Sequence, residues 1–345
     1  MDLCMLLPAK PDLRWALASQ MGIDSVIAKL APELTGQAPP FDLDSLRLHQ
    51  ARFRAAGHGI VGLEGDQFDM SRIKRGLPGR DEDIERYKRM LANMGKVGIP
   101  LLCLNFMVTG WQRTRTAVEA RGGAHVTAFD AQEAEALGPD PAGPIACDDL
   151  WDHFHYFIRR VAPAAEDAGV RLGLHPDDPP VDELRGVGRI LTSADAIERA
   201  IHLADSPQVG LTFCQGSFTT MGEDIGATAH RFADRIFFVH VRDVHGTARR
   251  FVETFPEDGD SDMAAMFRTY RDIGYDGPIR PDHAPAMAGD PVHRGEVVGT
   301  NVGYEAIGMV YTVGYIKGLM QATGLSWSRR GPHAGRPHSR DDHDA

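Results

Sequence analysis

Residues 80–105, RDEDIERYKRMLANMGKVGIPLLCLN, begin with a run of acidic residues and end with a short apolar run. In the first part, apolar residues recur at steps of three and four positions and so share one face of a helix: Ile84, Tyr87, Leu91, Met94 and Val97. The acidic residues occupy the first turn, where the positive end of the helix dipole favours them. Gly98 and Pro100 then end the helix, and the apolar run after them is typical of a buried strand. The stretch therefore predicts a helix followed by a strand, the repeating unit of an α/β fold.

The same alternation of short apolar runs and amphipathic stretches continues along the rest of the chain. The expected strands are residues 3–7, 25–28, 59–63, 100–105, 170–174, 210–213, 236–240 and 278–280. Further helices are expected at about residues 42–56, 148–168, 193–204, 222–232, 261–273 and 304–323. Because the strands alternate with helices and number eight, the pattern predicts a closed (β/α)8 TIM barrel built on a parallel sheet.

The chain has 345 residues, which is more than the ~250 residues of a typical barrel. The surplus falls in three long loops after strands, at residues 64–80, 106–146 and 284–303. Loops after strands are where barrel enzymes keep their substrate contacts. We expect residues 1–328 to form a single catalytic barrel domain and the polar residues 329–345 to form a disordered tail.

The composition argues against several classes of protein. With 37 Lys and Arg against 48 Asp and Glu, the formal net charge is −11, and binding to nucleic-acid phosphates needs clustered positive charge. No segment approaches the ~20 apolar residues of a membrane span, and the first residues do not resemble a secretion signal. The four cysteines are too sparse for a disulfide framework. We expect a cytoplasmic protein without a nucleic-acid or membrane partner.

Residues able to bind a metal end four successive expected strands. They are His175 after the fifth strand, Cys214 after the sixth, His240 in the seventh and Asp282 after the eighth. All strands of a barrel end at one mouth, and neighbouring strands lie ~4.8 Å apart. Each residue alone is more simply explained as a buried structural group, but together they predict a divalent-metal site. Imidazole, thiolate and carboxylate ligands suit Mn²⁺, Fe²⁺, Co²⁺ or Zn²⁺.

The stretch HPDDPP, residues 175–180, begins with the first of these ligands. A metal-bound histidine needs an acceptor for its second ring nitrogen, and we expect Asp177 or Asp178 to provide it or to bind substrate hydroxyls. The alternative is a solvated acidic turn. The prolines of this stretch prevent a helix directly after the strand.

Several motifs together resemble one known family. GLHPDDPP, GLTFCQGS, FVHVRD, RPDH and GYEAIGMVYTVGYIKGL are similar to motifs of the mannonate dehydratases of hexuronate breakdown. The resemblance covers about residues 59 to 323 and is weaker in the N-terminal third, as in a divergent member. It implies a xylose-isomerase-like barrel that converts D-mannonate to 2-keto-3-deoxy-D-gluconate. It also implies that the family's metal, typically Mn²⁺ or Fe²⁺, lies on the four residues His175, Cys214, His240 and Asp282.

The resemblance further implies roles for residues around the metal. His283 and Tyr304 would be the catalytic acid and base, without an assignment of which is which. Arg242 is placed to meet the substrate carboxylate, because guanidinium and carboxylate groups pair in a two-pronged fork, and to stabilise the enediolate formed when the proton beside the carboxylate is removed. The expected substrate contacts are Arg242, Asp177, Asp178 and Asn105.

Two other functions stay open at this point. A metal-dependent sugar isomerase or epimerase of the same barrel class would act on neutral sugars and would need no carboxylate clamp. A catalytically silent barrel would bind a sugar acid without changing it. In each case the expected partner is a small sugar or sugar acid, and we expect the barrel to form a homo-oligomer.

Overall fold

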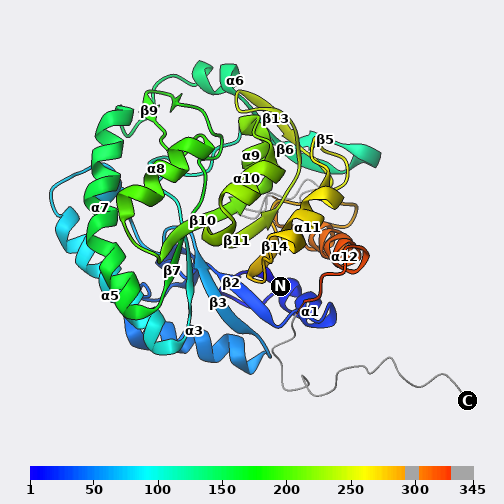
Figure 1. The fold of residues 1–345 in the computed structure, drawn as a ribbon, viewed down its shortest axis with the longest axis horizontal. Coiled ribbons are helices and arrows are strands. Elements are labelled where there is room, and N and C mark those ends of the chain that lie inside the picture. Colours follow the sequence, from blue (N-terminus) through cyan, green and yellow to red (C-terminus); the bar gives the residue numbers. More distant parts are fainter. Residues whose placement is uncertain (292–302, 328–345) are drawn as a thin grey trace, which may run out of the picture.

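A closed barrel of parallel strands forms the centre of the chain, whose computed structural model describes residues 1–291 and 303–327 (Figure 1). Its eight strands are β1 (Asp2–Leu7), β2 (Ser25–Ala28), β3 (Gly59–Glu64), β4 (Leu101–Leu104), β7 (Arg171–Leu174), β10 (Val209–Cys214), β11 (Ile236–Val241) and β14 (Pro278–Pro281). They neighbour one another in the order β1-β14-β11-β10-β7-β4-β3-β2, which is the chain order of a (β/α)8 barrel. The predicted fold class and all eight predicted strands are confirmed. The predicted tail and residues 292–302 of the last predicted long loop lie outside the described residues.

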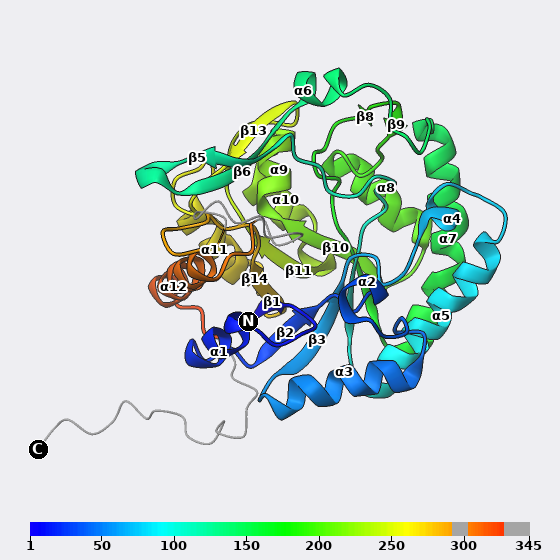
Figure 2. The ribbon, with the colours of Figure 1, turned by 180° about the vertical axis from the view of Figure 1, so that it is seen from behind.

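Helices cover the outside of the barrel, as the views from both sides show (Figures 1 and 2). The longer ones are α1 (Leu13–Gln20), α3 (Leu43–Ala55), α5 (Arg80–Val97), α7 (Cys147–Ala168), α8 (Ala194–Ala204), α11 (Met263–Asp272) and α12 (Ala306–Ala322). The shorter ones are α2 (Pro32–Thr35), α4 (Ser71–Lys74), α6 (Ala131–Ala136), α9 (Gln215–Met221) and α10 (Ile225–Arg231). Helix α5 ends at Gly98, whose φ of 74° is left-handed, as the sequence predicts. Helix α9 was not predicted, because its sequence QGSFTTM is poor in helix-forming residues and is stabilised by burial instead.

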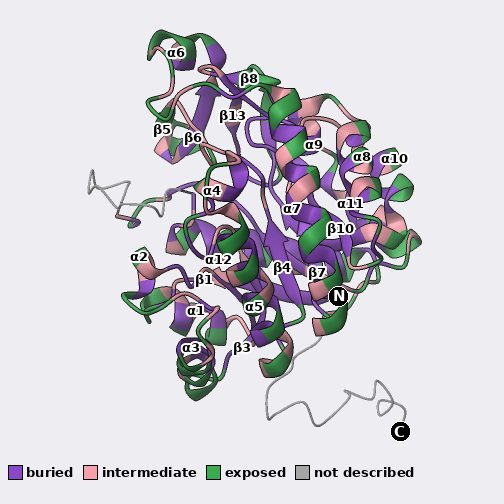
Figure 3. Cartoon of the chain, turned by 90° about the vertical axis from the view of Figure 1, so that its left-hand side faces the viewer, coloured by how far each residue is buried: buried purple, intermediate pink, exposed green. Residues whose placement is uncertain are grey.

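A second, antiparallel sheet lies beyond the barrel strands, on the side away from α3 (Figure 3). Its strands are β5 (Arg115–Glu119), β6 (His125–Asp130), β12 (Val244–Thr247) and β13 (Arg250–Glu253), in the order β12-β13-β6-β5. The expected long loop over residues 106–146 therefore contains two strands and the helix α6. The missed signal is Gly122–Gly123 between two runs rich in Val, Thr and Phe, which is typical of a hairpin. A smaller hairpin, β8 (Glu183–Leu184) with β9 (Val187–Gly188), follows β7.

The strand register decides which side chains meet at the mouth of the barrel. Cys214 of β10 lies opposite His240 of β11, and His240 lies opposite Arg280 of β14. The C-terminal ends of these three strands therefore lie at the same height in the barrel. Among the described residues, no helix combines the length and the apolar character needed to cross a membrane.

Helices α5 and α7 pack closely at Gly95. A Cβ added to Gly95 would lie 2.5 Å from the carbonyl oxygen of Ala168, a distance that the two backbones do not allow. We expect Gly95→Ala to lower the free energy of unfolding by about 1–2 kcal/mol, because the clash outweighs the ~1 kcal/mol gained in helix propensity. Urea unfolding measures this change. The control is Gly318→Ala in α12, where an added Cβ meets nothing within 4 Å. Equal stability of the two variants would contradict the close approach.

Candidate metal centre

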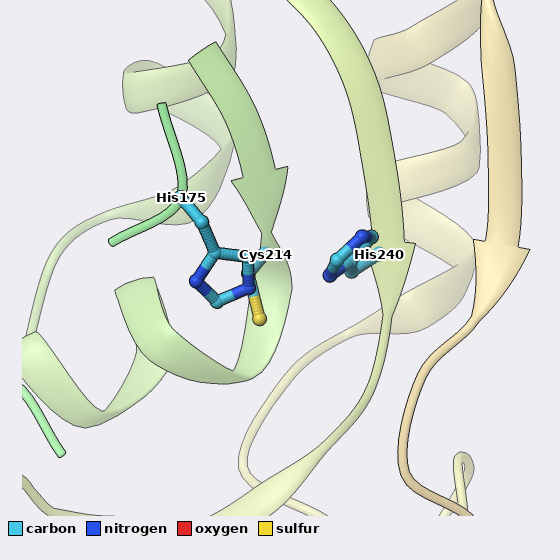
Figure 4. Close-up of side chains that lie close together, drawn as sticks. All are labelled: His175, Cys214 and His240. Atoms are coloured by element: carbon cyan, nitrogen blue, oxygen red, sulfur yellow. The ribbon is translucent and has the colours of Figure 1, made fainter. Parts of the chain in front are cut away.

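His175, Cys214 and His240 bring three potential ligand atoms within 4.8 Å of one another (Figure 4). His175 follows β7, Cys214 ends β10, and His240 lies near the end of β11. Cys214 and His240 are fully buried, and the two imidazole centroids are 5.0 Å apart. The parallel strands thus bring together three of the four predicted ligands.

The ring of His175 is held by the backbone. Its Nδ1 lies 2.6 Å from the carbonyl oxygen of Pro176. Since a carbonyl oxygen can only accept, Nδ1 carries the proton and Nε2 keeps the lone pair that a metal would need. We expected Asp177 or Asp178 to accept this hydrogen bond or to bind substrate hydroxyls, but the backbone carbonyl of Pro176 is the acceptor.

Asp177 and Asp178 are both buried and bind other parts of the protein. Asp177 accepts a hydrogen bond of 2.8 Å from the backbone N–H of Ile190, and burial raises its pKa. Asp178 pairs with Arg113 at 2.6 Å and with Arg242 at 2.7 Å. Burial alone would raise the pKa of Asp178, but the two guanidinium groups hold it well below its ordinary value. The alternative of a solvated acidic turn is therefore wrong, because both side chains are buried, and a contact of either with substrate hydroxyls stays a prediction.

Asp282 borders the three-donor group without belonging to it. Its Oδ1 accepts hydrogen bonds from the hydroxyl of Tyr304 at 2.7 Å and from Arg280 at 3.1 Å. Its Oδ2 lies 3.7 Å from Sγ of Cys214 and 4.0 Å from Nδ1 of His240. Burial would raise the pKa of Asp282, but the positive side chains around it hold that pKa well below its ordinary value. One oxygen of an ionised carboxylate therefore faces the donors.

The donor set fits a divalent metal. Nε2 of His240 is buried and has no hydrogen bond within the described part of the chain, and a buried polar atom without a partner is costly. Two imidazoles and a thiol, with the carboxylate of Asp282 beside them, are ligands typical of first-row transition metals.

Glu64, at the end of β3, is a residue that the sequence analysis missed. Its carboxylate lies 3.5 Å from Nε2 of His240 and forms, with Cys103 and His240, a second group of potential ligands. Both of its oxygens accept hydrogen bonds from Arg280, at 2.5 and 3.0 Å. Burial would raise the pKa of Glu64, but Arg280 lowers it to about 2. Because Arg280 already neutralises Glu64, this second group suits a cation less well. The signal was a carboxylate at a strand end, one residue beyond the predicted strand.

Arg242 is 1% exposed and binds protein groups with both terminal nitrogens. Nη1 donates to Asp178 at 2.7 Å and to Glu253 at 3.0 Å, and Nη2 donates to Ser217 at 3.1 Å. Both terminal nitrogens thus already bind protein groups, and a contact of Arg242 with a substrate carboxylate stays a prediction. Nε makes no hydrogen bond within the described residues and lies 3.5 Å from Oδ2 of Asp282.

His283 and Tyr304, the predicted catalytic pair, lie side by side with ring centroids 5.2 Å apart. Nδ1 of His283 lies 2.6 Å from a carboxylate oxygen of Glu253. The ring also packs edge-on against Trp111, with centroids 5.0 Å apart. Burial raises the pKa of Tyr304 well above its ordinary value. Trp111 comes from a segment that was expected to be a loop, and Glu253 lies between an expected strand and an expected helix, so their place beside His283 was not predicted.

Asn105 anchors the loop that follows β4. Its side-chain oxygen accepts hydrogen bonds from Nζ of Lys74 at 3.0 Å and from the backbone N–H of Met107 at 3.2 Å. Lys74 is itself buried and pairs with Asp66 at 2.7 Å. These contacts give Asn105 a structural role, and a contact with substrate stays a prediction.

Comparisons with known proteins agree with this geometry. The family model described as D-mannonate dehydratase (UxuA) matches residues 13–143 and 142–328. A mannonate dehydratase of Streptococcus equi subsp. zooepidemicus is 33% identical over 88% of this chain and 90% of its own length. The crystal structure of mannonate dehydratase from Streptococcus suis serotype 2 has a TM-score of 0.84 and 30% identity, covering 98% of this chain and 99% of that one. A xylose isomerase domain protein from Planctomyces limnophilus, with a TM-score of 0.60 and 14% identity over 93% of this chain and 97% of that one, shares the fold.

Removing the thiol of Cys214 tests the metal centre. We expect Cys214→Ala to weaken divalent-metal binding at least ten- to a hundredfold. A loss of this size already follows when a residue that hydrogen-bonds a metal ligand is replaced. Metal content after loading with Mn²⁺, and the thiolate absorption band of the Co²⁺-loaded protein, measure the effect. Cys147→Ala is the matched control, because Cys147 starts α7 and lies outside both groups of potential ligands. Retention of metal and of the thiolate band in Cys214→Ala would contradict this assignment.

Proposed function

This chain belongs to the D-mannonate dehydratase family, and we propose that it removes water from D-mannonate to give 2-keto-3-deoxy-D-gluconate. The observation that carries the proposal is the three-donor group of His175, Cys214 and His240, bordered by a carboxylate that binds Tyr304. Tyr304 in turn packs against His283. This arrangement supports the proposal, because the dehydration of a sugar acid needs metal ligands and proton-transfer groups at one mouth.

We propose Mn²⁺ or Fe²⁺ as the metal, held by the three donors together with Asp282. When bound, the metal would supply Lewis-acid stabilisation of the negative charge that develops on the substrate. A set of imidazole, carboxylate and thiolate donors is compatible with either ion. Metal analysis of the purified protein distinguishes them.

The two proton transfers are assigned to His283 and Tyr304. Since the proton on Nδ1 of His283 is donated to Glu253, Nε2 carries the lone pair and suits the base that takes the proton beside the substrate carboxylate. Tyr304 keeps its proton, because burial raises the pKa of its hydroxyl, and suits the acid that assists the leaving hydroxyl. Trp111, with 37% of its surface exposed, would limit the access of water to His283.

The other predicted substrate contacts receive narrower roles. Arg242 keeps Nε as a hydrogen-bond donor for a substrate oxygen. We propose that Asp178 acts on the substrate through Arg242, and that Asp177 and Asn105 act through the loops that they hold in place.

We further propose that the protein works in the cytoplasm, because a thiolate ligand needs a reducing compartment and all four cysteines are free. Assembly into a homo-oligomer stays a prediction, which size-exclusion chromatography with light scattering tests.

A direct assay tests the function. We expect the purified protein with Mn²⁺ to convert D-mannonate into a 2-keto-3-deoxy acid, detected as a new α-keto group, and to lose this activity with a chelator. D-Gluconate, which differs from D-mannonate at the carbon that loses the proton, is the control substrate. Absence of keto acid from D-mannonate in a metal-loaded preparation would contradict the proposal, and turnover of neutral sugars instead would favour an isomerase or epimerase.

Tyr304→Phe removes the hydroxyl and leaves the ring that packs on His283. We expect kcat to fall by about 10²–10⁴-fold, the usual contribution of a general acid, while the metal content is kept. Tyr311→Phe is the matched control, because the hydroxyl of Tyr311 binds Glu257 at an exposed site. Similar kcat values for the two variants would contradict the role of Tyr304 as the general acid.

A further inference from the structure

We propose that Glu253, brought to the barrel mouth by the antiparallel sheet, is a positioning residue that holds His283 with Nε2 toward the substrate. The inference rests on the proposed function, since it assigns His283 a base role, and it adds a residue that the sequence analysis did not identify. It also gives the antiparallel sheet a part in catalysis.

Glu253 sits where the sheet meets the barrel. It is the last residue of β13 and is 3% exposed. Its Oε1 accepts from Arg113 at 2.6 Å and from Arg242 at 3.0 Å, and its Oε2 accepts from the hydroxyl of Thr127 at 2.6 Å. Arg113 and Thr127 belong to the sheet region, whereas Arg242 follows β11 of the barrel. These partners fix the carboxylate from both sides.

The fixed carboxylate decides where the proton of His283 lies. Burial alone would raise the pKa of Glu253, but the positive groups around it hold that pKa well below its ordinary value. An ionised carboxylate can only accept hydrogen bonds, so Nδ1 of His283, 2.6 Å away, must be the donor. In the neutral ring, Nε2 is then left as the acceptor, which is the form a base needs.

Arg242 makes this tautomer dependent on Glu253. Nη1 of Arg242 lies 3.2 Å from Nδ1 of His283, and two donors cannot share a hydrogen bond. Without the carboxylate, the N–H of Arg242 would donate to a bare Nδ1, and the proton would move to Nε2. The imidazole would keep its place but could no longer accept a proton from the substrate.

Glu253→Gln tests the inference, because the amide keeps the shape of the side chain and removes its charge. We expect kcat for D-mannonate to fall by about 10²–10⁴-fold, as when the carboxylate that orients a catalytic histidine is replaced by its amide. KM and the content of bound Mn²⁺ should change little. The control is Glu257→Gln, four positions along the chain, where the carboxylate pairs with Arg121 on the outside of the protein. If Glu253→Gln keeps its metal and its kcat lies within about threefold of the control, a factor worth less than 1 kcal/mol, the inference is overturned.

A second measurement is made on the wild-type protein and needs no turnover. ¹⁵N NMR of histidine side chains in the Zn²⁺-loaded wild-type protein reports which ring nitrogen carries the proton, and H283N identifies the signals of His283. We expect a protonated Nδ1 and a bare Nε2 in the neutral ring of His283. A proton on Nε2 would overturn the inference. Failure of the wild type to act on D-mannonate would instead reject the proposed function and leave the tautomer result standing.

Discussion

The parallel pairing of β10, β11 and β14 is the constraint on which the rest of the site depends. It places Cys214 beside His240, and His240 beside Arg280. A shift of one residue along any of these strands would turn its side chain to the opposite face of the sheet. His175, which follows β7, and Asp282, which follows β14, then reach the same mouth. The site is therefore a consequence of barrel closure.

Buried charge makes this mouth rigid. Arg113, Arg242 and Arg280 face the carboxylates of Asp178, Glu253, Asp282 and Glu64 in one set of ion pairs, which Arg242 and Asp282 connect at 3.5 Å. Such pairs add little net stability, but removing one partner leaves an uncompensated buried charge at a cost of about 3–5 kcal/mol. The set therefore resists rearrangement, and it keeps the proton-transfer groups in their positions before the substrate binds. We regard this preorganisation as its main role.

Local periodicity predicted the barrel, and strand ends predicted the metal donors. Helix α5 and the eight strands follow from apolar spacing, and His175, Cys214 and His240 follow from their position at strand ends. The β5–β6 hairpin has a local signal, but the pairing of β6 with β13 joins segments more than 100 residues apart, which no local pattern reports. For the same reason, the partners of Asp178 and Arg242 could not be predicted: the two side chains pair with each other, and Arg242 also donates to Glu253.

Anomalous X-ray diffraction from crystals of the wild-type protein grown with Mn²⁺ tests the central claim most directly. The account predicts one strong manganese peak per chain, within coordination distance of His175, Cys214 and His240, with Asp282 as the oxygen ligand. A peak between Glu64 and Cys103, or one whose ligands do not include the sulfur of Cys214, would contradict it.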